Sequence, residues 1–171
     1  MTRQFTKRGY DSITEEINFL WNEERPMVLQ EVHDAALQGD RSENAAYIYG
    51  KQRMRMIDKR LRILRQKIKD VKVVDTDTLP KSSIVSFGAL VTVEDEDGKL
   101  MTLRLVDKEE IDPERMLVSV QSPIGRALLG KEEGDEFDLV LPKGTVTYDI
   151  ITVHYGPDPN GYNPDNTEES S

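Results

Sequence analysis

Two carboxylates stand three residues apart in the stretch QGDRSENAAY, which covers residues 38–47. If a helix begins here, Asp40 can cap it while Glu43 reaches back to the cap, as in a variant of the capping box. Alternatively, one or both carboxylates bind a hard cation such as Mg²⁺, which takes few protein oxygens together with waters. Two carboxylates cannot hold such an ion alone, so this second interpretation requires further ligands from a partner or a substrate phosphate.

A run of bases follows the acidic pair. Nine bases and one acid, Asp58, lie between Lys51 and Lys69. Such a surplus of bases either pairs with an acidic neighbouring helix or attracts an RNA or DNA backbone. Both interactions can occur together, because different faces of one helix can make them. The bases that we assign to an RNA-contacting face are Lys51, Arg53, Arg55, Lys59, Arg60 and Arg62.

Other kinds of chemistry find little support. The chain has no cysteine, which excludes disulfides, thiolate chemistry and cysteine-ligated zinc. His33 and His154 are far apart in the sequence, and the DEDG stretch at 95–98 lacks the ligand spacing of a calcium loop. No nucleophile–base pair, glycine-rich phosphate loop or dinucleotide fingerprint is present. We therefore do not expect an autonomous enzyme.

Two helices are predicted on either side of the acidic pair. The first covers about residues 10–37, with apolar residues spaced by threes and fours, a break at Pro26 and Gly39 as its stop. The second runs from Glu43 to Asp70, and a connection this short makes the two helices antiparallel. Its apolar residues recur at steps of four and three, as in a coiled-coil seam: Met54, Ile57, Leu61, Leu64, Ile68 and Val71.

Opposite charges favour the same pairing. The first helix carries seven acids and one base between Asp11 and Asp34, whereas the second is basic. Charges of opposite sign on facing helices help to choose their orientation, although each exposed pair contributes only about 0–1 kcal/mol. The acidic pair therefore lies at the end of a helical hairpin.

The second half of the chain changes to a period of two. Val91 and Val93 face Met101, Leu103 and Leu105 across the EDEDGKL turn, which predicts a β-hairpin. A second hairpin joins residues 137–141 to residues 146–150 through PKG, with a bulge at Ile150–Ile151. Between the hairpins, Ser122 caps a short helix that starts at Pro123 and ends before Gly130. The predicted fold class is α+β with an antiparallel sheet.

Composition sets the remaining expectations. The net charge is −9, and no segment has the length and apolarity of a signal peptide or a membrane span. We expect a cytoplasmic protein that does not engage a membrane. Residues 1–75 should form the N-terminal coiled-coil hairpin, 76–83 a linker and 84–156 the C-terminal domain, followed by a disordered acidic tail at 157–171.

The motifs resemble a known family. The bacterial Gre transcript-cleavage (transcription elongation) factors resemble this chain in three stretches: EERP, the following GDRSENAAY and the basic KQRMRMIDKRLRILRQKI. The EERP and GDRS residues are most similar to the GreB branch of that family. The stretch SPIGRALLGKEEGDEFDLVLPKGTVTYDI resembles the globular half of the same family. The similarity covers about residues 5–156. One departure is Ala46, where family members often have another acid.

This resemblance implies a function. A factor of this family binds RNA polymerase in backtracked elongation complexes through an FKBP-like C-terminal domain and inserts its coiled coil into the secondary channel. Asp40 and Glu43 would help to hold a second Mg²⁺ beside the polymerase's own ion, and Ser42 would help to orient the attacking water. The basic face would guide the nascent RNA 3′ end. The polymerase remains the catalyst.

Two rival functions stay open on the sequence. A Gre-like channel occupant can inhibit or modulate polymerase without cleavage, because a fold does not decide an activity. Alternatively, the C-terminal domain is a prolyl-isomerase-like binding module and the coiled coil merely dimerises. Its few scattered aromatic residues form no clear proline pocket, and we expect a monomer.

Overall fold

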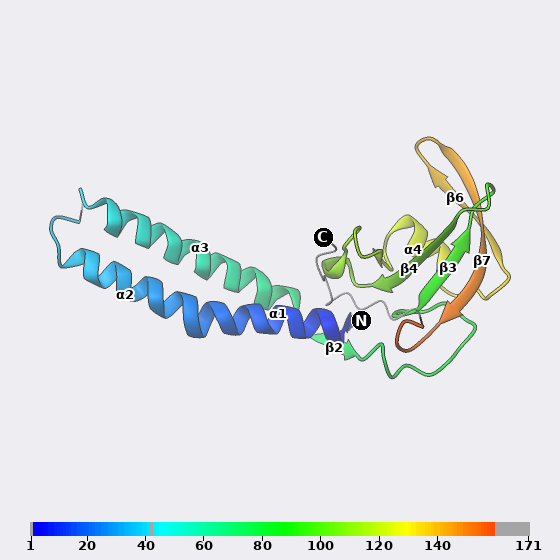
Figure 1. Ribbon diagram of the computed structural model, residues 1–171, viewed down its shortest axis with the longest axis horizontal. Helices are drawn as coiled ribbons and strands as arrows, with labels where there is room; N and C mark the ends of the chain where they lie inside the picture. Colours follow the sequence, from blue (N-terminus) through cyan, green and yellow to red (C-terminus); the bar gives the residue numbers. More distant parts are fainter. Residues whose placement is uncertain (1, 42, 160–171) are drawn as a thin grey trace. The chain divides into compact units, whose positions relative to one another are not determined.

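The computed structural model describes residues 2–41 and 43–159, in two compact units. One unit is a helical hairpin, Gly9–Asp70; the other combines Met1–Arg8 with the chain from Val71 onward. The predicted combination of a helical hairpin and a sheet domain is therefore confirmed (Figure 1). The sheet is not wholly antiparallel as predicted, because residues 117–119 pair parallel with residues 104–106. Most of the predicted acidic tail, residues 160–171, lies outside the described part of the chain.

The first arm of the hairpin is interrupted where the sequence predicts a break. It consists of α1 (Lys7–Phe19), a π-helical segment η1 (Leu20–Glu24) and α2 (Arg25–Ala36). Pro26 has no N–H to donate to the carbonyl of Asn22, and just before it the Arg25 N–H bonds to the Leu20 carbonyl, five residues back. This π segment inserts one extra residue into the helical turn before Pro26. The first arm therefore continues through Pro26 as a helix instead of ending there.

The second arm is α3 (Ala45–Lys67), which runs beside α2 in Figure 1. Its predicted seam is confirmed in the middle, where the buried residues of the hairpin are Leu20, Val28, Ile57, Leu61 and Leu64. The predicted helix was too long at both ends. Ile68 closes α3, and Val71 belongs to a strand rather than to the seam.

Trp21 lies at the surface of the hairpin, although the spacing of apolar residues in the first arm includes it. Its side chain is 49% exposed, while its neighbour Leu20 is buried. The guanidinium groups of Arg25 and Arg65 each lie 5.2 Å from the centre of the indole ring, in the range of cation–π contacts. Trp21 thus links the two arms at the surface of the hairpin instead of filling its core.

A parallel strand pair that the sequence did not predict belongs to the second unit. Strands β1 (Arg3–Thr6) and β2 (Val71–Val74) pair in register, with Arg3 opposite Val71. Phe5 is completely buried. Val74 therefore belongs to a strand of the second unit and not to the helical hairpin, in which the predicted range 1–75 included it. Residues 76–83, predicted as a linker, lie against the second unit, where Thr76 is buried and Leu79 packs on the core.

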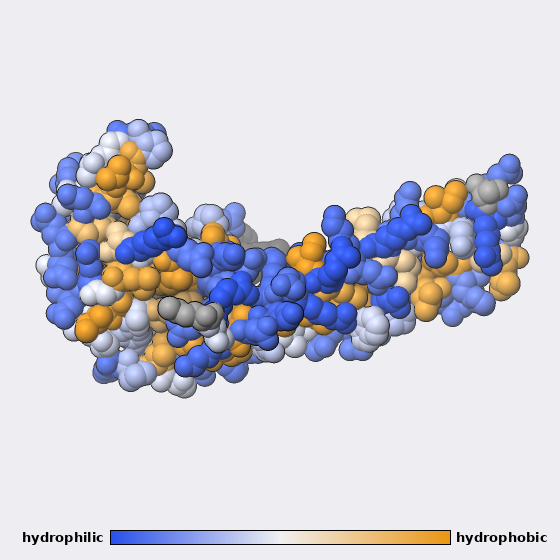
Figure 2. Space-filling view, turned by 180° about the vertical axis from the view of Figure 1, so that it is seen from behind, coloured by the Kyte–Doolittle hydropathy of each residue, from blue (hydrophilic) through white to orange (hydrophobic). Residues whose placement is uncertain are grey.

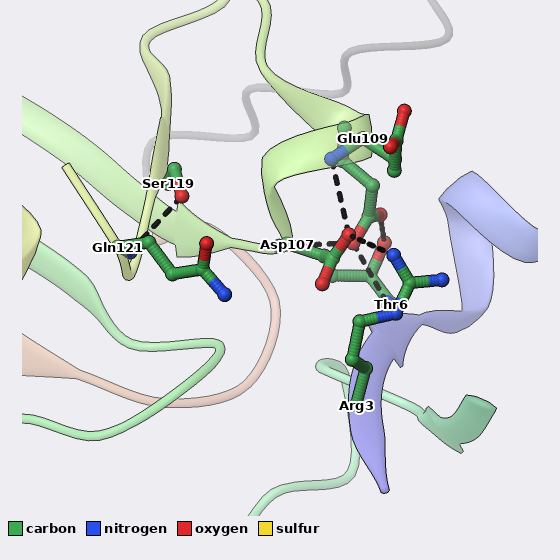
Figure 3. Close-up of polar contacts among 7 residues, drawn as sticks. Arg3, Thr6, Asp107, Glu109, Ser119 and Gln121 are labelled. Atoms are coloured by element: carbon green, nitrogen blue, oxygen red, sulfur yellow. Dashed lines mark hydrogen bonds and ion pairs between the residues drawn. The ribbon is translucent and has the colours of Figure 1, made fainter. Parts of the chain in front are cut away.

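Strand β1 is held by a short helical turn, η2 (Lys108–Glu110). The Thr6 N–H donates to the Glu110 carboxylate at 3.1 Å, and the Thr6 hydroxyl contacts the same carboxylate. Arg3 pairs with Asp107 at 3.6 Å, and Asp107 caps η2 by accepting from the Glu109 N–H (Figure 3). The amino-terminal strand is thereby fixed on the sheet domain through charged and polar contacts.

The sheet of the second unit has the order β5-β4-β3-β7-β6. Its strands are β3 (Leu90–Glu94), β4 (Leu100–Val106), β5 (Leu117–Ser119), β6 (Glu136–Leu141) and β7 (Gly144–His154). Both predicted hairpins are confirmed: Val93 pairs with Met101, and Phe137 pairs with Tyr148. Opposite Thr92 and Val93, the register of β7 skips Ile151, which confirms the predicted bulge.

One helix, α4 (Pro123–Leu128), packs on the apolar face of this sheet. As predicted, Ser122 caps it by accepting from the Gly125 N–H at 3.1 Å. Gly125 touches the backbone of the preceding strand so closely that an added β-carbon would lie 2.1 Å from the Ser119 carbonyl oxygen. Leu128, in the same helix, is fully buried in the core of the domain.

Candidate functional site: the acidic tip of the hairpin

The acidic pair lies in the loop that joins α2 to α3. Both Asp40 and Glu43 are exposed, and the Glu43 N–H donates to the Asp40 carbonyl at 3.3 Å. A bond from residue i+3 to residue i closes a β-turn, which holds the two Cα atoms within about 7 Å of each other. This backbone turn therefore brings the two predicted acids close to each other in the loop. Ser42, the third predicted tip residue, lies outside the described residues.

The capping role proposed for this pair belongs to another residue. Asn44 is the N-cap of α3, and its side-chain oxygen accepts from the Tyr47 N–H at 3.1 Å. The helix starts at Ala45, two residues later than predicted, so the capping-box interpretation of Asp40 and Glu43 is wrong. Asparagine is among the best N-cap residues, and its place directly before the helical run was the signal that could have identified it.

The loop is held from both helix ends. Asn44 also donates from Nδ2 to the Ala35 carbonyl of α2 at 2.6 Å. The guanidinium group of Arg41 lies 5.6 Å from the centre of the ring of Tyr47, a residue in the first turn of α3. Gly39 has a φ of 153°, a backbone conformation that residues with side chains rarely adopt.

The described residues of the tip supply only part of a metal-ligand set. Within residues 2–41 and 43–159, no group of three or more His, Cys, Asp or Glu side chains is placed to bind one. Glu43 makes no side-chain hydrogen bond or ion pair with any described residue. The donor set, two exposed carboxylates in one turn, suits a hard cation such as Mg²⁺ only if another molecule supplies the remaining ligands.

The six predicted basic residues separate into two groups. Arg60 makes a two-pronged contact with Glu16 at 2.8 and 3.0 Å, and this hydrogen-bonded partner raises the pKa of Arg60. Arg53 pairs with Glu31 at 3.0 Å. These two arginines therefore join the arms of the hairpin, as the charge pattern predicts. In a third pair, at 2.9 Å, the first arm supplies the base, Arg25, and α3 supplies the acid, Asp58.

The other four bases form a stripe on α3, which we call the basic stripe: Lys51, Arg55, Lys59 and Arg62. All four are exposed, and none has an ion-pair partner among the described residues. Their steps of four, four and three residues place them within an arc of roughly 80°, on the side of α3 away from the buried Ile57 and Leu61. On the face seen in Figure 2, the hairpin is mainly hydrophilic, with apolar side chains interspersed.

Comparison with known proteins decides the family. The model of the GreA/GreB transcription elongation factor C-terminal domain matches residues 80–155, and that of the transcription elongation factor N-terminal domain matches residues 3–73. The chain belongs to the GreA/GreB family. The N-terminal match contains the whole tip of this Gre-family chain, including Asp40, Glu43 and Asn44.

Named relatives agree with this assignment. The chain is 44% identical to transcription elongation factor GreB of Yersinia pestis over 89% of this chain and 88% of that protein. It is 41% identical to GreB of Haemophilus influenzae over 88% of this chain and 94% of that protein. The predicted resemblance to the GreB branch is therefore confirmed. Among solved structures, Gfh1 of Thermus thermophilus matches 90% of this chain and 99% of that one at 22% identity, with a TM-score of 0.40.

None of the helices in the described residues is long and apolar enough to cross a bilayer. In the sheet domain, Phe137 and Tyr148 stack on each other at 5.5 Å, and Tyr155 is buried with its hydroxyl bonded to the backbone. These aromatic side chains therefore contribute to core packing.

Proposed function

We propose that this Gre-family chain stimulates the cleavage of backtracked RNA by bacterial RNA polymerase. The sheet domain, which we take to be FKBP-like, binds the polymerase, and the helical hairpin enters the secondary channel. The chain acts as a cytoplasmic monomer, since its helical seam is already filled within one hairpin. The polymerase supplies the active site, so the factor is not an enzyme by itself.

The observation that supports this proposal best is the placement of the acidic pair. Asp40 and Glu43 share one turn at the closed end of the hairpin, and α3 is capped by Asn44 rather than by either acid. Both residues are exposed, and the side-chain cap of α3 comes from Asn44. An incompletely coordinated ion in a narrow channel of low dielectric would interact strongly with them.

Each tip residue has a defined role in this proposal. Asp40 and Glu43 provide oxygens for a second Mg²⁺, shared with the polymerase and not bound tightly by the factor alone, and Ser42 helps to orient a water. That ion would supply activation of the water and stabilisation of charge at the scissile phosphate, as in two-metal phosphodiester cleavage. The basic stripe, with Arg53 and Arg60 beside it, guides the RNA 3′ segment through its phosphates.

A cleavage assay tests the proposal. Backtracked complexes incubated with Mg²⁺ and the wild-type chain should yield shortened transcripts. Asp40→Asn and Glu43→Gln should remove the stimulation, while helix content and affinity for polymerase stay near those of the wild type, because neither acid caps α3. Asp34→Asn, an exposed acid on α2 of the same hairpin, is the matched control and should cleave normally.

Two outcomes would contradict the proposal. Transcripts of unchanged length would remove the cleavage activity, and slowed elongation in the same reactions would favour the inhibitory channel occupant instead. Catalysis of proline isomerisation in a peptide, together with a mass in light scattering that rises with concentration, would favour the binding module with a dimerising coiled coil.

A further inference from the structure

Asn44 uses both halves of its side-chain amide at the tip. The oxygen accepts from the Tyr47 N–H in the first turn of α3, and Nδ2 donates to the Ala35 carbonyl in the last turn of α2. Each helix end leaves four backbone groups without a partner inside the helix. One side chain therefore bonds to an N–H at the start of α3 and to a carbonyl at the end of α2, which also accepts from the Gln38 N–H at 3.1 Å.

This double role is specific to asparagine among the good N-cap residues. Ser, Thr and Asp can accept from the third helical N–H as well as Asn does. Asp has no donor, and Ser has a single oxygen too close to the backbone to serve both partners. Only an amide presents an acceptor and a donor on separate atoms of a short side chain. Capping alone thus does not account for the residue at position 44.

The contacts lead directly to the acids. Asn44 is bonded to both helix ends, Glu43 precedes it in the chain, and the Glu43 N–H is bonded to the Asp40 carbonyl. The Arg41 contact with Tyr47 places a second link between the loop and α3. Each step from the helix ends through Asn44 and Glu43 to Asp40 is a covalent bond or a hydrogen bond. The carboxylates are thereby tied to the two helices without any direct contact from Asn44 to either of them.

We infer that Asn44 is a positioning residue, which closes the tip loop and holds the acid pair ready before the hairpin meets its target. This inference rests on the proposed function, because it assigns Asn44 a role in the same site. A loop that is already ordered avoids the entropy of ordering on binding. Catalytic groups also lose effectiveness steeply when they are displaced by about 1 Å.

Asn44→Ser separates the two halves of this role. Serine retains the cap of α3 and removes the bond to Ala35. Asn18→Ser, at an exposed position of α1, is the matched control. Amide hydrogen exchange in residues 37–43 should accelerate by about fivefold, the factor that corresponds to one ordinary hydrogen bond, while exchange in the middle of α3 stays unchanged. This measurement requires no polymerase.

Cleavage provides the second readout. At saturating factor, the cleavage rate with Asn44→Ser should fall by roughly tenfold or more, whereas the factor concentration for half-maximal stimulation should change little. The Mg²⁺ concentration for half-maximal cleavage should rise. Asn44→Asp is an equally good cap without an amide donor, so it should accelerate loop exchange in the same way. If the serine variant loses helix content, the aspartate variant tests the role of the bond to Ala35 instead.

The outcomes are distinct. Unchanged loop exchange, or a normal maximal rate, would overturn the role of Asn44. A loss of helix content in both variants would reduce Asn44 to a structural cap and overturn it as well. If the wild type fails to shorten transcripts, the proposed function fails, but accelerated loop exchange would still establish the bond to Ala35 as the element that orders the loop.

Discussion

Gly50 of α3 meets Val32 of α2 at a distance that leaves no room for a side chain. A β-carbon added to Gly50 would lie 2.6 Å from Cγ2 of Val32, below the separation that real β-carbons show. Glycine inside a helix is unfavourable by about 1 kcal/mol relative to alanine. Its presence in the second turn of α3 is explained by this close approach of the two arms near the tip.

Gly50→Ala should therefore lower the free energy of unfolding, even though alanine favours a helix. Val32 has a β-branched side chain with few alternative rotamers, so it cannot easily move away. Adding Val32→Ala should recover stability, with a favourable coupling of about 0.5–3 kcal/mol in a double-mutant cycle measured by urea unfolding. A gain of about 1 kcal/mol from Gly50→Ala alone would show that the contact relaxes freely.

The basic stripe and the paired arginines should respond differently to neutralisation. Replacing Lys51, Arg55, Lys59 and Arg62 by Gln should weaken binding of a short single-stranded RNA and reduce its salt dependence, by a slope of about 0.7 for each phosphate that the variant no longer neutralises. Fluorescence anisotropy at several salt concentrations measures both. The stability of the hairpin should stay within about 0.5 kcal/mol.

Arg53→Gln and Arg60→Gln provide the comparison for this set. These variants break exposed pairs with Glu31 and Glu16, so each should lower the free energy of unfolding by about 0–1 kcal/mol. Their effect on the salt slope should be smaller than that of the stripe. Equal slopes for the two sets would contradict the division of the basic face.

Glu110 should give the sheet domain an unusual dependence on pH. Burial raises the pKa of Glu110, against the hydrogen bonds from Thr6 and from the Asp107 N–H, and nearby Asp107 raises it further. The folded state therefore holds this proton more tightly than the unfolded state. The contribution to stability is complete below the ordinary pKa of glutamate and is lost as pH rises through the raised value.

Glu110→Gln removes this titration and keeps an oxygen for the Thr6 N–H. The free energy of unfolding of the wild type minus that of the variant should decrease as pH rises from about 4.3, the ordinary value for glutamate. Chemical denaturation at a series of pH values measures this difference. Parallel profiles for the two proteins would mean that Glu110 does not titrate differently on folding.

Tyr155→Phe should destabilise the sheet domain by about 1–3 kcal/mol, the cost of leaving buried polar groups unpaired. The Tyr155 hydroxyl accepts from the Ser86 N–H at 2.8 Å and donates to the Ile84 carbonyl. Tyr148→Phe is the matched control, because the Tyr148 ring stacks on Phe137 and its hydroxyl has no partner among the described residues. Equal losses in denaturant unfolding would contradict a special role for the Tyr155 hydroxyl.

Local pattern was enough to predict much of this protein. The heptad spacing of Ile57, Leu61 and Leu64, the opposite charges of the two arms and the alternation in both β-hairpins depend on neighbours within a few residues. The tip motif identified the family for the same reason, since its residues are contiguous in the chain. Features that depend only on residues close together in the chain can be predicted from the sequence.

Tertiary structure decided what depends on distant partners. The parallel pairing of β1 with β2, separated by the entire hairpin, carries no local signal, and neither does the bond from Thr6 to Glu110. At the tip, the sequence supplied the acids and an asparagine placed to cap α3, but only the approach of α2 to α3 showed that Asn44 also bonds to Ala35. A side chain's partner is set by which backbone groups the folded chain brings within reach, and for these residues that partner lies on another element.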